Sequence, residues 1–402
     1  MSTGESSETT GKRPNIVLLV ALTGIGPLAT HIFVPALPDA ARDLGVTSGT
    51  IQLTITAFLV GIATGQLIYG PLSDRFGRKP VLLCGFIFYL VATVFAAISW
   101  TLDMLIIARV LQALGGCSGL VLGRAIVRDS AAPDKAAALM ATMNFGLSLA
   151  PAIAPAIGGL LTAWFGWRGV LGALAIAIAI LIGLAVFVLA ETNQTRTQWA
   201  GIAPMLRSYS QLVAMASFRA FTICGAACTA SAYAFFSASP FIFGQMLGRP
   251  IEEFGFYYFV LVGGFALGSV LAQRLARRSQ SRTAILIGVS LCIAGATGLM
   301  VVHLSGALSV VTILGTMFIF ATGGGLVGPH ASVGAMNAAP RAIGAAAGLY
   351  GFWQMAFGAI CTLVVSFWDD GTILPLATVL VTSSLTGLLV MLHGTRAPRA
   401  GA

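Results

Sequence analysis

The sequence predicts an all-α membrane protein whose twelve transmembrane helices form two pseudo-symmetric six-helix bundles. Three observations lead to this prediction. Of the 402 residues, 57% are hydrophobic and only 9% are charged, a composition that excludes a soluble domain. Apolar segments of about 20 residues, the length that spans a bilayer as a helix, recur along the whole chain. Most of the basic residues fall in alternate loops between these segments.

Six spans are expected on each side of a long central loop. The first six cover Asn15–Leu37, Ile51–Leu72, Val81–Trp100, Leu102–Val127, Ala136–Phe165 and Val170–Leu189. The last six cover Phe218–Leu247, Glu253–Leu275, Thr283–His303, Leu308–Gly328, Ile343–Trp368 and Ile373–His393. The chain therefore divides into a cytoplasmic tail at 1–14, a first bundle at 15–190, a cytoplasmic central loop at 191–217, a second bundle at 218–393 and a cytoplasmic tail at 394–402.

The loop charges predict the orientation of these spans. One set of alternate loops is basic and contains Lys12, Arg13, Arg75, Arg78, Lys79, Arg128, Lys135, Arg196, Arg207, Arg274, Arg277, Arg278, Arg282, Arg341, Arg396 and Arg399. The other set contains Asp39, Arg42, Asp43, Asp103, Arg168, Arg249, Glu252, Glu253, Asp369 and Asp370. Basic loops face the cytoplasm, so both termini are expected there, in a bacterial inner membrane. The net charge of +9 is thus a topological signal, and its scattered bases exclude a nucleic-acid face.

Cysteine and histidine usage argues against a metal centre or an enzyme. The six cysteines lie inside apolar segments without paired spacing, as small buried hydrophobic residues do. The four histidines are scattered along the chain, whereas a membrane-embedded enzyme needs a paired nucleophile and base or a metal set. We therefore expect no metal, no cofactor and no enzymatic activity.

The loop after the second span carries the strongest motif. A glycine, an acid and a base are followed by a second glycine and two further bases. These residues are Gly70, Asp74, Arg75, Gly77, Arg78 and Lys79. Gly70 is expected where two helices cross closely, Gly77 where the backbone turns, and Asp74 as the local partner of the bases. These features suit a topology-setting loop with a solvated salt bridge. The order also resembles the loop signature of the major facilitator superfamily, in which this loop is a conformational latch.

Two further expectations follow for this loop. Asp129, at the end of the fourth span, is expected to pair with Arg78, and in the family such a charge cluster locks the outward-facing state. Asp74 is also expected at the N-terminus of a second-half helix near Ile343, where the helix dipole favours an anion. A worn copy of the loop, Gly268–Arg274, lacks the acid. Paired halves imply alternating access around a site near the bilayer midplane.

The fourth span contains an arginine within the predicted membrane. Arg109 and Gln112 are three residues apart and share a helical face, with Gly116 one turn further on. Arg109 either snorkels to the nearby outer end of its helix or has a function. The spacing resembles a second superfamily motif, which is associated with proton coupling.

The fifth span is rich in proline and glycine. Gly146, Pro151, Pro155, Gly158 and Gly159 suit a kinked helix with close neighbours. Their spacing also resembles the fifth-helix motif of the family's exporters. With Phe165–Arg168 and Glu191-Thr192, the resemblance narrows to the bicyclomycin and chloramphenicol resistance branch of twelve-span drug:proton antiporters, and it covers nearly the whole chain.

The first span departs from that branch at His31, where the branch normally has an acid. No Asp or Glu falls within any predicted hydrocarbon segment, so the usual carboxylate proton carrier is missing. His31 lies at a depth similar to that of Arg109. Histidine exchanges a proton near neutral pH and can replace the acid. The alternative is a neutral pocket histidine in a transporter whose coupling is altered or lost.

The same residues indicate the class of substrate. With Arg109 and His31 but no carboxylate, the cavity disfavours a lipophilic dication and suits neutral or weakly anionic amphiphiles of the phenicol or bicyclomycin type. The expected site residues are His31, Arg109, Gln112, Asn144, Tyr233, Trp353 and Gln354. We expect a monomer in the lipid bilayer, a small-molecule substrate and protons as the coupling ion. The alternatives are an exporter of an amino acid or siderophore, and a facilitator without proton coupling.

Overall fold

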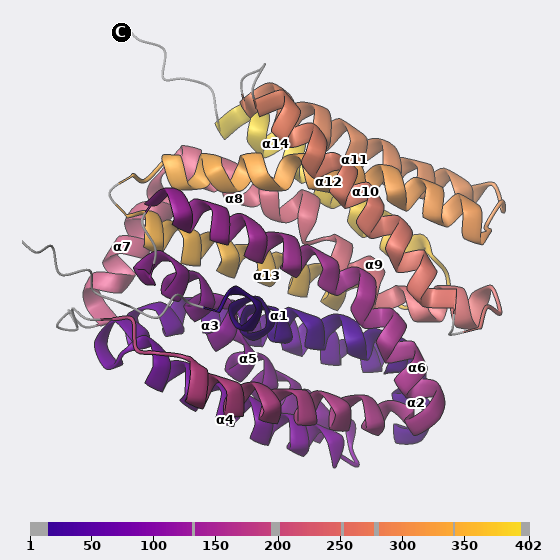
Figure 1. Cartoon of the computed structure of the whole chain (residues 1–402). Coiled ribbons are helices and arrows are strands. Elements are labelled where there is room, and N and C mark those ends of the chain that lie inside the picture. The colour runs from indigo at the N-terminus through magenta and orange to yellow at the C-terminus, as the bar shows by residue number, and fades with distance from the viewer. Residues whose placement is uncertain are drawn as a thin grey trace, which may run out of the picture.

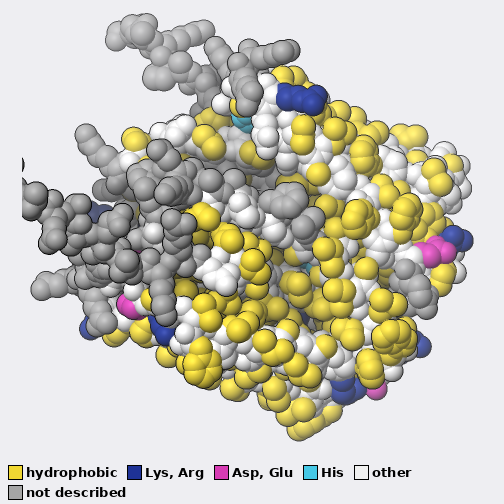
Figure 2. Space-filling model, in the orientation of Figure 1, with side chains coloured by type: hydrophobic (Ala, Val, Ile, Leu, Met, Phe, Trp, Pro, Cys, Tyr) yellow, Lys and Arg dark blue, Asp and Glu magenta, His cyan; other side chains and the backbone are white. Residues whose placement is uncertain are grey.

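A computed structural model describes residues 15–130, 133–193, 202–250, 253–276, 281–340 and 342–394, and across these ranges the regular structure is entirely helical. In Figure 1 the first-half helices, indigo to magenta, fill the lower part of the view, and most second-half helices fill the upper part. Hydrophobic side chains cover most of the visible surface, and the few charged ones lie mainly toward its edges (Figure 2). An apolar belt of this kind suits lipid as the surrounding solvent.

The first half contains α1 (Ile16–Phe33), η1 (Val34–Ala36), α2 (Leu37–Leu44), α3 (Ser48–Phe76), α4 (Arg78–Ala97), α5 (Leu102–Ser130) and α6 (Pro133–Val188). The first span is longer than predicted, since α2 continues α1 after the short turn η1. Pro35 and Pro38 permit this because each lies in the first turn of the helix that it enters. Asp39, Arg42 and Asp43, expected in a loop, therefore lie on α2.

The fifth and sixth predicted spans follow each other directly within α6, which consists of two helices on either side of Gly166. Eleven apolar helices are long enough to cross a membrane among the described residues, and one of them, Ala150–Val188, has 39 residues. A straight helix of 39 residues would extend about 58 Å at 1.5 Å per residue, roughly twice the thickness of the hydrocarbon core. Gly166 interrupts it with a φ of 67° and a ψ of −179°. The glycine is the turn between two spans, so the prediction of twelve spans is consistent with this count.

The second half contains α8 (Ala216–Thr229), α9 (Ala232–Phe241), η2 (Ile242–Met246), α10 (Phe254–Ala276), α11 (Ser281–Leu304), α12 (Val310–Asn337), α13 (Ile343–Phe367) and α14 (Leu374–Gly394). The predicted span Phe218–Leu247 is thus divided among three elements. The last of them, η2, is a π-helix that follows Pro240. A π-helical turn holds one extra residue, which shifts the direction of the side chains that follow it.

The predicted central loop, 191–217, contains an additional helix, α7 (Ile202–Ala214). No helix was expected within this loop from the sequence, and the structure adds an amphipathic one. Leu212 is buried and packs with Phe218, Leu349 and the partly buried Tyr209. Outside the described residues lie both predicted tails, except Gly394, and also Arg196, Glu252, Arg277, Arg278 and Arg341.

The two halves share one buried core at one end of the helices. We call the end with the Gly70–Lys79 loop the latch end, and the end with Gly45 and Gly166 the opposite end. A single cluster of buried side chains continues from Phe33 and Ile55 in the first half to Phe241 and Val365 in the second. These residues lie toward the opposite end, so the halves are sealed together there.

Candidate coupling and gating sites

Arg109 on α5 is completely buried, with 0% of its surface exposed. Its Nη1 donates to Gln112 Oε1 at 2.6 Å, and its Nη2 donates to the carbonyl of Ala29 on α1 at 3.4 Å. Gln112 Nε2 in turn donates to Thr93 Oγ1 on α4 at 2.9 Å. The prediction that Arg109 and Gln112 act on one face is confirmed, and together they link three helices.

Aromatic rings complete the surroundings of this guanidinium. Its central carbon lies 4.2 Å from the ring centre of Phe58 and 4.7 Å from that of Phe33. Two ring faces stabilise a desolvated cation electrostatically. The snorkelling alternative was wrong, because these partners hold the side chain inside the first half. Close packing brings α1 near, since a Cβ on Gly26 would lie 2.7 Å from the carbonyl oxygen of Gly116.

His31 lies at the boundary between the two halves. It belongs to α1, is only 3% exposed, and its Nδ1 has no hydrogen-bond partner within the described part of the chain. Its ring centre is 5.0 Å from that of Phe236 and 5.9 Å from that of Tyr233, both on α9. The structure therefore brings the predicted residues His31 and Tyr233 together. A change in the charge of His31 would act directly on a contact between the halves.

The remaining predicted binding residues lie apart from this pair. Asn144 is exposed on α6, and Trp353 on α13 is 39% exposed. Gln354 Nε2 donates to Thr229 Oγ1 on α8 at 2.8 Å, which joins two helices of the second half. Among the described contacts, none connects these three residues to His31 or Arg109. Their role in binding stays a prediction.

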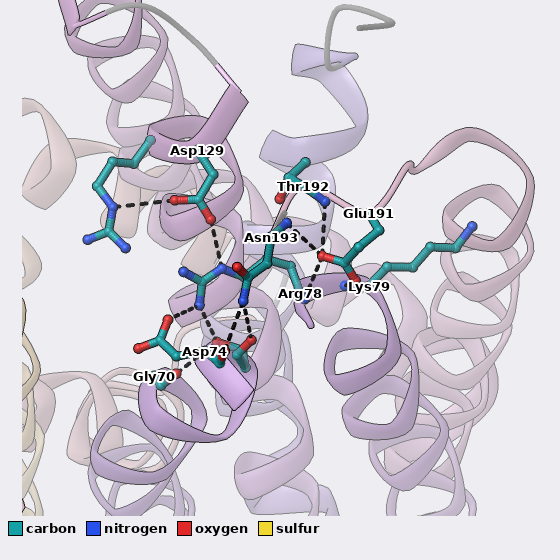
Figure 3. Close-up of polar contacts among 10 residues, drawn as sticks. Gly70, Asp74, Arg78, Lys79, Asp129, Glu191, Thr192 and Asn193 are labelled. Atoms are coloured by element: carbon teal, nitrogen blue, oxygen red, sulfur yellow. Dashed lines mark hydrogen bonds and ion pairs between the residues drawn. The ribbon is translucent and has the colours of Figure 1, made fainter. Parts of the chain in front are cut away.

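The latch is built around Arg78 (Figure 3). Its side chain is only 6% exposed. Nε donates to Asp129 Oδ2 at 2.8 Å, and Nη1 donates to Ser73 Oγ at 2.6 Å and to Asp74 Oδ1. The predicted pair of Arg78 with Asp129 is confirmed, as is the role of Asp74 as a local partner. The contact expected between Asp74 and the helix that begins at Ile343 is not made among the described residues in this conformation, where α13 has no side-chain cap.

Glu191 completes the latch and was missed as a site residue. Its carboxylate accepts from the backbone N–H groups of Arg78 at 2.9 Å, Lys79 at 3.1 Å, Thr192 at 2.9 Å and Asn193 at 2.8 Å. Two of these groups begin α4, whose positive dipole end favours an anion. Glu191 is 112 residues from Lys79, and the sequence signalled it only as an acid just after the sixth span and as part of the Glu191-Thr192 pair that resembles the branch. Figure 3 shows Glu191 and Asn193 beside the loop.

The two latch glycines differ in their surroundings. Gly77 has a φ of 100°, and a Cβ there would lie 2.5 Å from Glu191 Oε2, so its predicted role in the turn is confirmed. The close crossing expected at Gly70 was wrong, since a Cβ there would meet nothing within 4 Å. The close crossings occur at Gly61 and Gly65, where a Cβ would lie 2.6 Å from side chains of α5. These residues face α5, whereas Gly70 lies beyond the crossing.

Arg75 also belongs to the predicted latch. Its guanidinium carbon lies 4.8 Å from the ring centre of Phe76. It neighbours Asp74 in sequence, whereas the acid itself bonds to Arg78. Arg78 is therefore the base that organises this network.

The glycines of the fifth-span motif bring α6 against α1. A Cβ on Gly146 would lie 2.5 Å from Val20 Cγ1, and one on Gly158 would lie 2.0 Å from the carbonyl oxygen of Ile32. Pro151 and Pro155 lie inside the same helix, and Gly159 is buried. The packing expectation is confirmed, while the exporter role stays a prediction.

The opposite end contains a second set of charged contacts. Asp39 Oδ2 accepts from the backbone N–H of Trp167 at 3.0 Å, and Asp43 accepts from Trp167 Nε1 at 3.2 Å and from Arg168. These bonds fix α2 against the turn at Gly166. A hollow of ≈ 500 Å³ lies between the halves here and is lined by residues that include Arg42, Thr162, Gln245 and Arg249.

Comparison with known proteins identifies the family. Residues 19–362 match the model of the Major Facilitator Superfamily. The chloramphenicol resistance protein of Pseudomonas aeruginosa is 31% identical over 370 residues, which cover 90% of this chain and 85% of that protein. Multidrug resistance protein D of Escherichia coli is 29% identical over 379 residues, 94% of each chain. A bicyclomycin resistance protein homolog of Haemophilus influenzae is 25% identical over 363 residues, which cover 90% of this chain and 91% of that one.

Solved structures agree on the fold. A D-xylose-proton symporter superposes with a TM-score of 0.73 at 13% identity, covering 95% of this chain and 97% of its own. An inward-facing, unoccupied bacterial homolog of the human lysosomal transporter Spinster gives a TM-score of 0.70 at 12% identity, covering 94% and 93%. With the family model matched over most of its length, the chain belongs to the major facilitator superfamily.

Proposed function

We propose that this protein exports neutral or weakly anionic amphiphilic small molecules, of the phenicol or bicyclomycin type, by alternating access between its two halves. The observation that carries the proposal is the buried cation Arg109, which is bonded to the carbonyl of Ala29 on the helix that carries the seam residue His31, in spans that contain no carboxylate away from their ends. Such a site repels a dication and tolerates a neutral or anionic ligand. The relatives named for chloramphenicol, multidrug and bicyclomycin resistance support the same substrate class.

We further infer that export is coupled to protons through His31. Its unbonded Nδ1 can take up a proton, and its ring touches Tyr233 and Phe236 of the other half. Charging the ring would alter this inter-half contact, which links protonation to a change of conformation. The alternative is a facilitator in which His31 stays neutral.

The test is chloramphenicol-dependent proton movement in proteoliposomes under an imposed pH gradient. His31→Asn should bind chloramphenicol but lose proton-coupled flux, and His31→Asp should restore it. His330→Asn is the matched control, because His330 is also buried but lies on α12 of the second half. If the unaltered protein and both His31 variants move the drug without protons, the facilitator alternative replaces the antiporter.

In the cell we place the protein in the bacterial inner membrane as a monomer, with the latch end and both termini in the cytoplasm. Arg78, Lys79 and Arg128 at the latch end support this orientation. Labelling of single cysteines in intact cells with a membrane-impermeant maleimide tests it. Thr372→Cys at the opposite end should react from outside, and Ser208→Cys on α7 should not.

A further inference from the structure

Helix α3 of the first half and α13 of the second half run antiparallel across the seam. Four residues on one face of α3 contact the second half near the opposite end: Ser48, Gly49, Gln52 and Thr56. Their partners are Asp369, Ser366, Ser237 and Thr362. The spacing of one, four and eight residues from Ser48 follows the helical repeat. This stripe is the polar part of the seal between the halves.

Asp369 occupies a distinctive position in this stripe. Ser48 Oγ donates to Asp369 Oδ2 at 2.5 Å, and Ser48 is the first residue of α3. Thr47, the N-cap residue, accepts from the backbone N–H of Thr50. The carboxylate of the second half therefore lies at the positive end of a first-half helix dipole, where an anion is stabilised.

Gly49 makes this approach possible. A Cβ at this position would lie 2.5 Å from the carbonyl oxygen of Ser366 and 2.9 Å from Asp369 Cβ. The hydroxyl of Ser366 also donates to the carbonyl of Gly49. Only glycine permits contact this close. The Gly49–Ser366 backbone contact and the Asp369 carboxylate therefore indicate independently that the two halves are tightly closed at this point.

The other end of the same helix pair lacks a carboxylate contact of this kind among the described residues. At the latch end, α13 begins without a side-chain cap on its N-terminal N–H groups. Asp74 bonds instead to Arg78 of its own half. Thus, in this conformation, the inter-half carboxylate contact is made at the N-terminus of α3.

We propose that Asp369 is a second latch, which closes the opposite end by binding the N-terminus of α3 and must release it when that end opens. The inference rests on the proposed alternating access and adds a residue that controls it. Asp74 and Asp369 then act on the two antiparallel helices in turn, Asp74 on α13 and Asp369 on α3. Asp369 is a positioning residue, since it sets the conformation and need not touch the substrate.

The test measures how readily the opposite end opens. Ala238 is 7% exposed and lines a small hollow with Gln52 and Asp369, so Ala238→Cys reports opening to a membrane-impermeant maleimide added outside intact cells. The parent carries Cys84→Ser, which removes the exposed native cysteine, and the parent without Ala238→Cys gives the background. Asp369→Asn should raise the labelling rate about three- to fivefold, because it weakens the exposed hydrogen bond from Ser48 and also removes the anion from the N-terminus of α3.

Asp370→Asn is the matched control. This substitution removes one negative charge from the same loop as Asp369→Asn does. The Asp370 carboxylate, however, accepts from the N–H and hydroxyl of Thr372 in its own half. The proposal predicts labelling at the parent rate for this variant. Ser48→Ala, which leaves every charge in place, should raise labelling about two- to threefold and serves if Asp369→Asn does not fold.

Two results would overturn the second latch: an unchanged labelling rate in both Asp369→Asn and Ser48→Ala, or an equal rise in Asp370→Asn. The assay needs neither a drug nor a pH gradient, so its outcome is separate from that of the export experiment. If Asp369→Asn labels faster but the unaltered protein does not export chloramphenicol, the proposal of a second latch stands and the proposed substrate class is wrong. If the unaltered protein exports chloramphenicol but labelling is unchanged in the variants, the proposed function stands and the second latch is wrong.

Discussion

The two ends of the molecule each hold an arginine against carboxylates, but they differ in their access to water. At the latch end Arg78 is 6% exposed and binds both Asp74 and Asp129. At the opposite end Arg168 is 42% exposed, binds Asp43 and stacks on the ring of Trp167. Water screens exposed ion pairs and competes for their hydrogen bonds, whereas loss of a buried partner strands a charge. Two arginine–carboxylate pairs in the same protein therefore differ in strength, because one is buried and the other is exposed to water.

The largest expected effect comes from neutralising these two arginines. Arg78→Gln should lower the free energy of unfolding by about 2 kcal/mol, because the charge-assisted hydrogen bonds of the buried guanidinium to Asp74 and Asp129 are lost. Arg168→Gln should cost about 1 kcal/mol or less. Thermal unfolding in detergent, followed by intrinsic fluorescence, measures both. Equal shifts in the two variants would break the comparison of the ends.

A second pair of variants compares glycines with positive φ at the two ends. Gly77→Ala should cost about 2 kcal/mol, since strain at φ 100° adds to the contact with Glu191. Gly371→Ala, at φ 75° with open space around it, should cost about 1 kcal/mol from strain alone. The same unfolding assay applies. A smaller loss at Gly77 than at Gly371 would show that Glu191 moves aside freely.

Glu191 offers a third comparison, because it binds backbone N–H groups and not an arginine. Glu191→Gln keeps the shape but loses the charge at the start of α4, and it should lower stability by about 1 kcal/mol. The control is Glu253→Gln at the opposite end, whose carboxylate is exposed. Hydrogen exchange of the amides of Arg78 and Lys79 should speed up only in the Glu191 variant. An unchanged rate of hydrogen exchange at these two amides in Glu191→Gln would show that Glu191 does not stabilise the latch.

The smallest expected effect is a pH dependence at the opposite end. The hydroxyl of Tyr257 donates to Glu253, and this bond, with Arg249 nearby, holds the pKa of Glu253 below its usual range. A depressed pKa adds stability above the unfolded-state value near 4.5, and that stability is lost as pH falls through the folded-state value. The melting temperatures of the unaltered protein and Glu253→Gln should therefore differ slightly at pH 7 and converge at low pH. A gap that persists in acid would contradict this assignment.

Short-range patterns predicted much of what the structure contains. Arg109 and Gln112 could be paired because helical spacing puts residues three apart on one face, and Gly77 because a basic turn needs a flexible backbone. Asp129 could be placed near Arg78 because α5 ends on the same side as α4 begins. The spans followed from hydropathy alone, since lipid requires internally bonded backbone.

Contacts between distant segments were beyond such patterns. Glu191 and Asp369 bind residues more than 100 positions away, and no local periodicity specifies those partners. Gly70 was misplaced because the sequence shows a small residue but not which neighbour approaches it. The helix α7 was missed since Pro204 and Arg207 resemble the residues of a loop, while its stability comes from packing on the second half.

The turn at Gly166 has a consequence for how the chain enters the membrane. In the proposed orientation Arg168 must cross to the outer side, against the tendency of basic residues to stay in the cytoplasm. Its acceptor Asp43 lies 125 residues earlier, so a chain inserted in order of synthesis places that acid outside first. Asp43 is therefore already on the outer side when the last helical hairpin of the first half is inserted, and it can pair with Arg168 at once. The order of synthesis thus helps this arginine to cross the membrane.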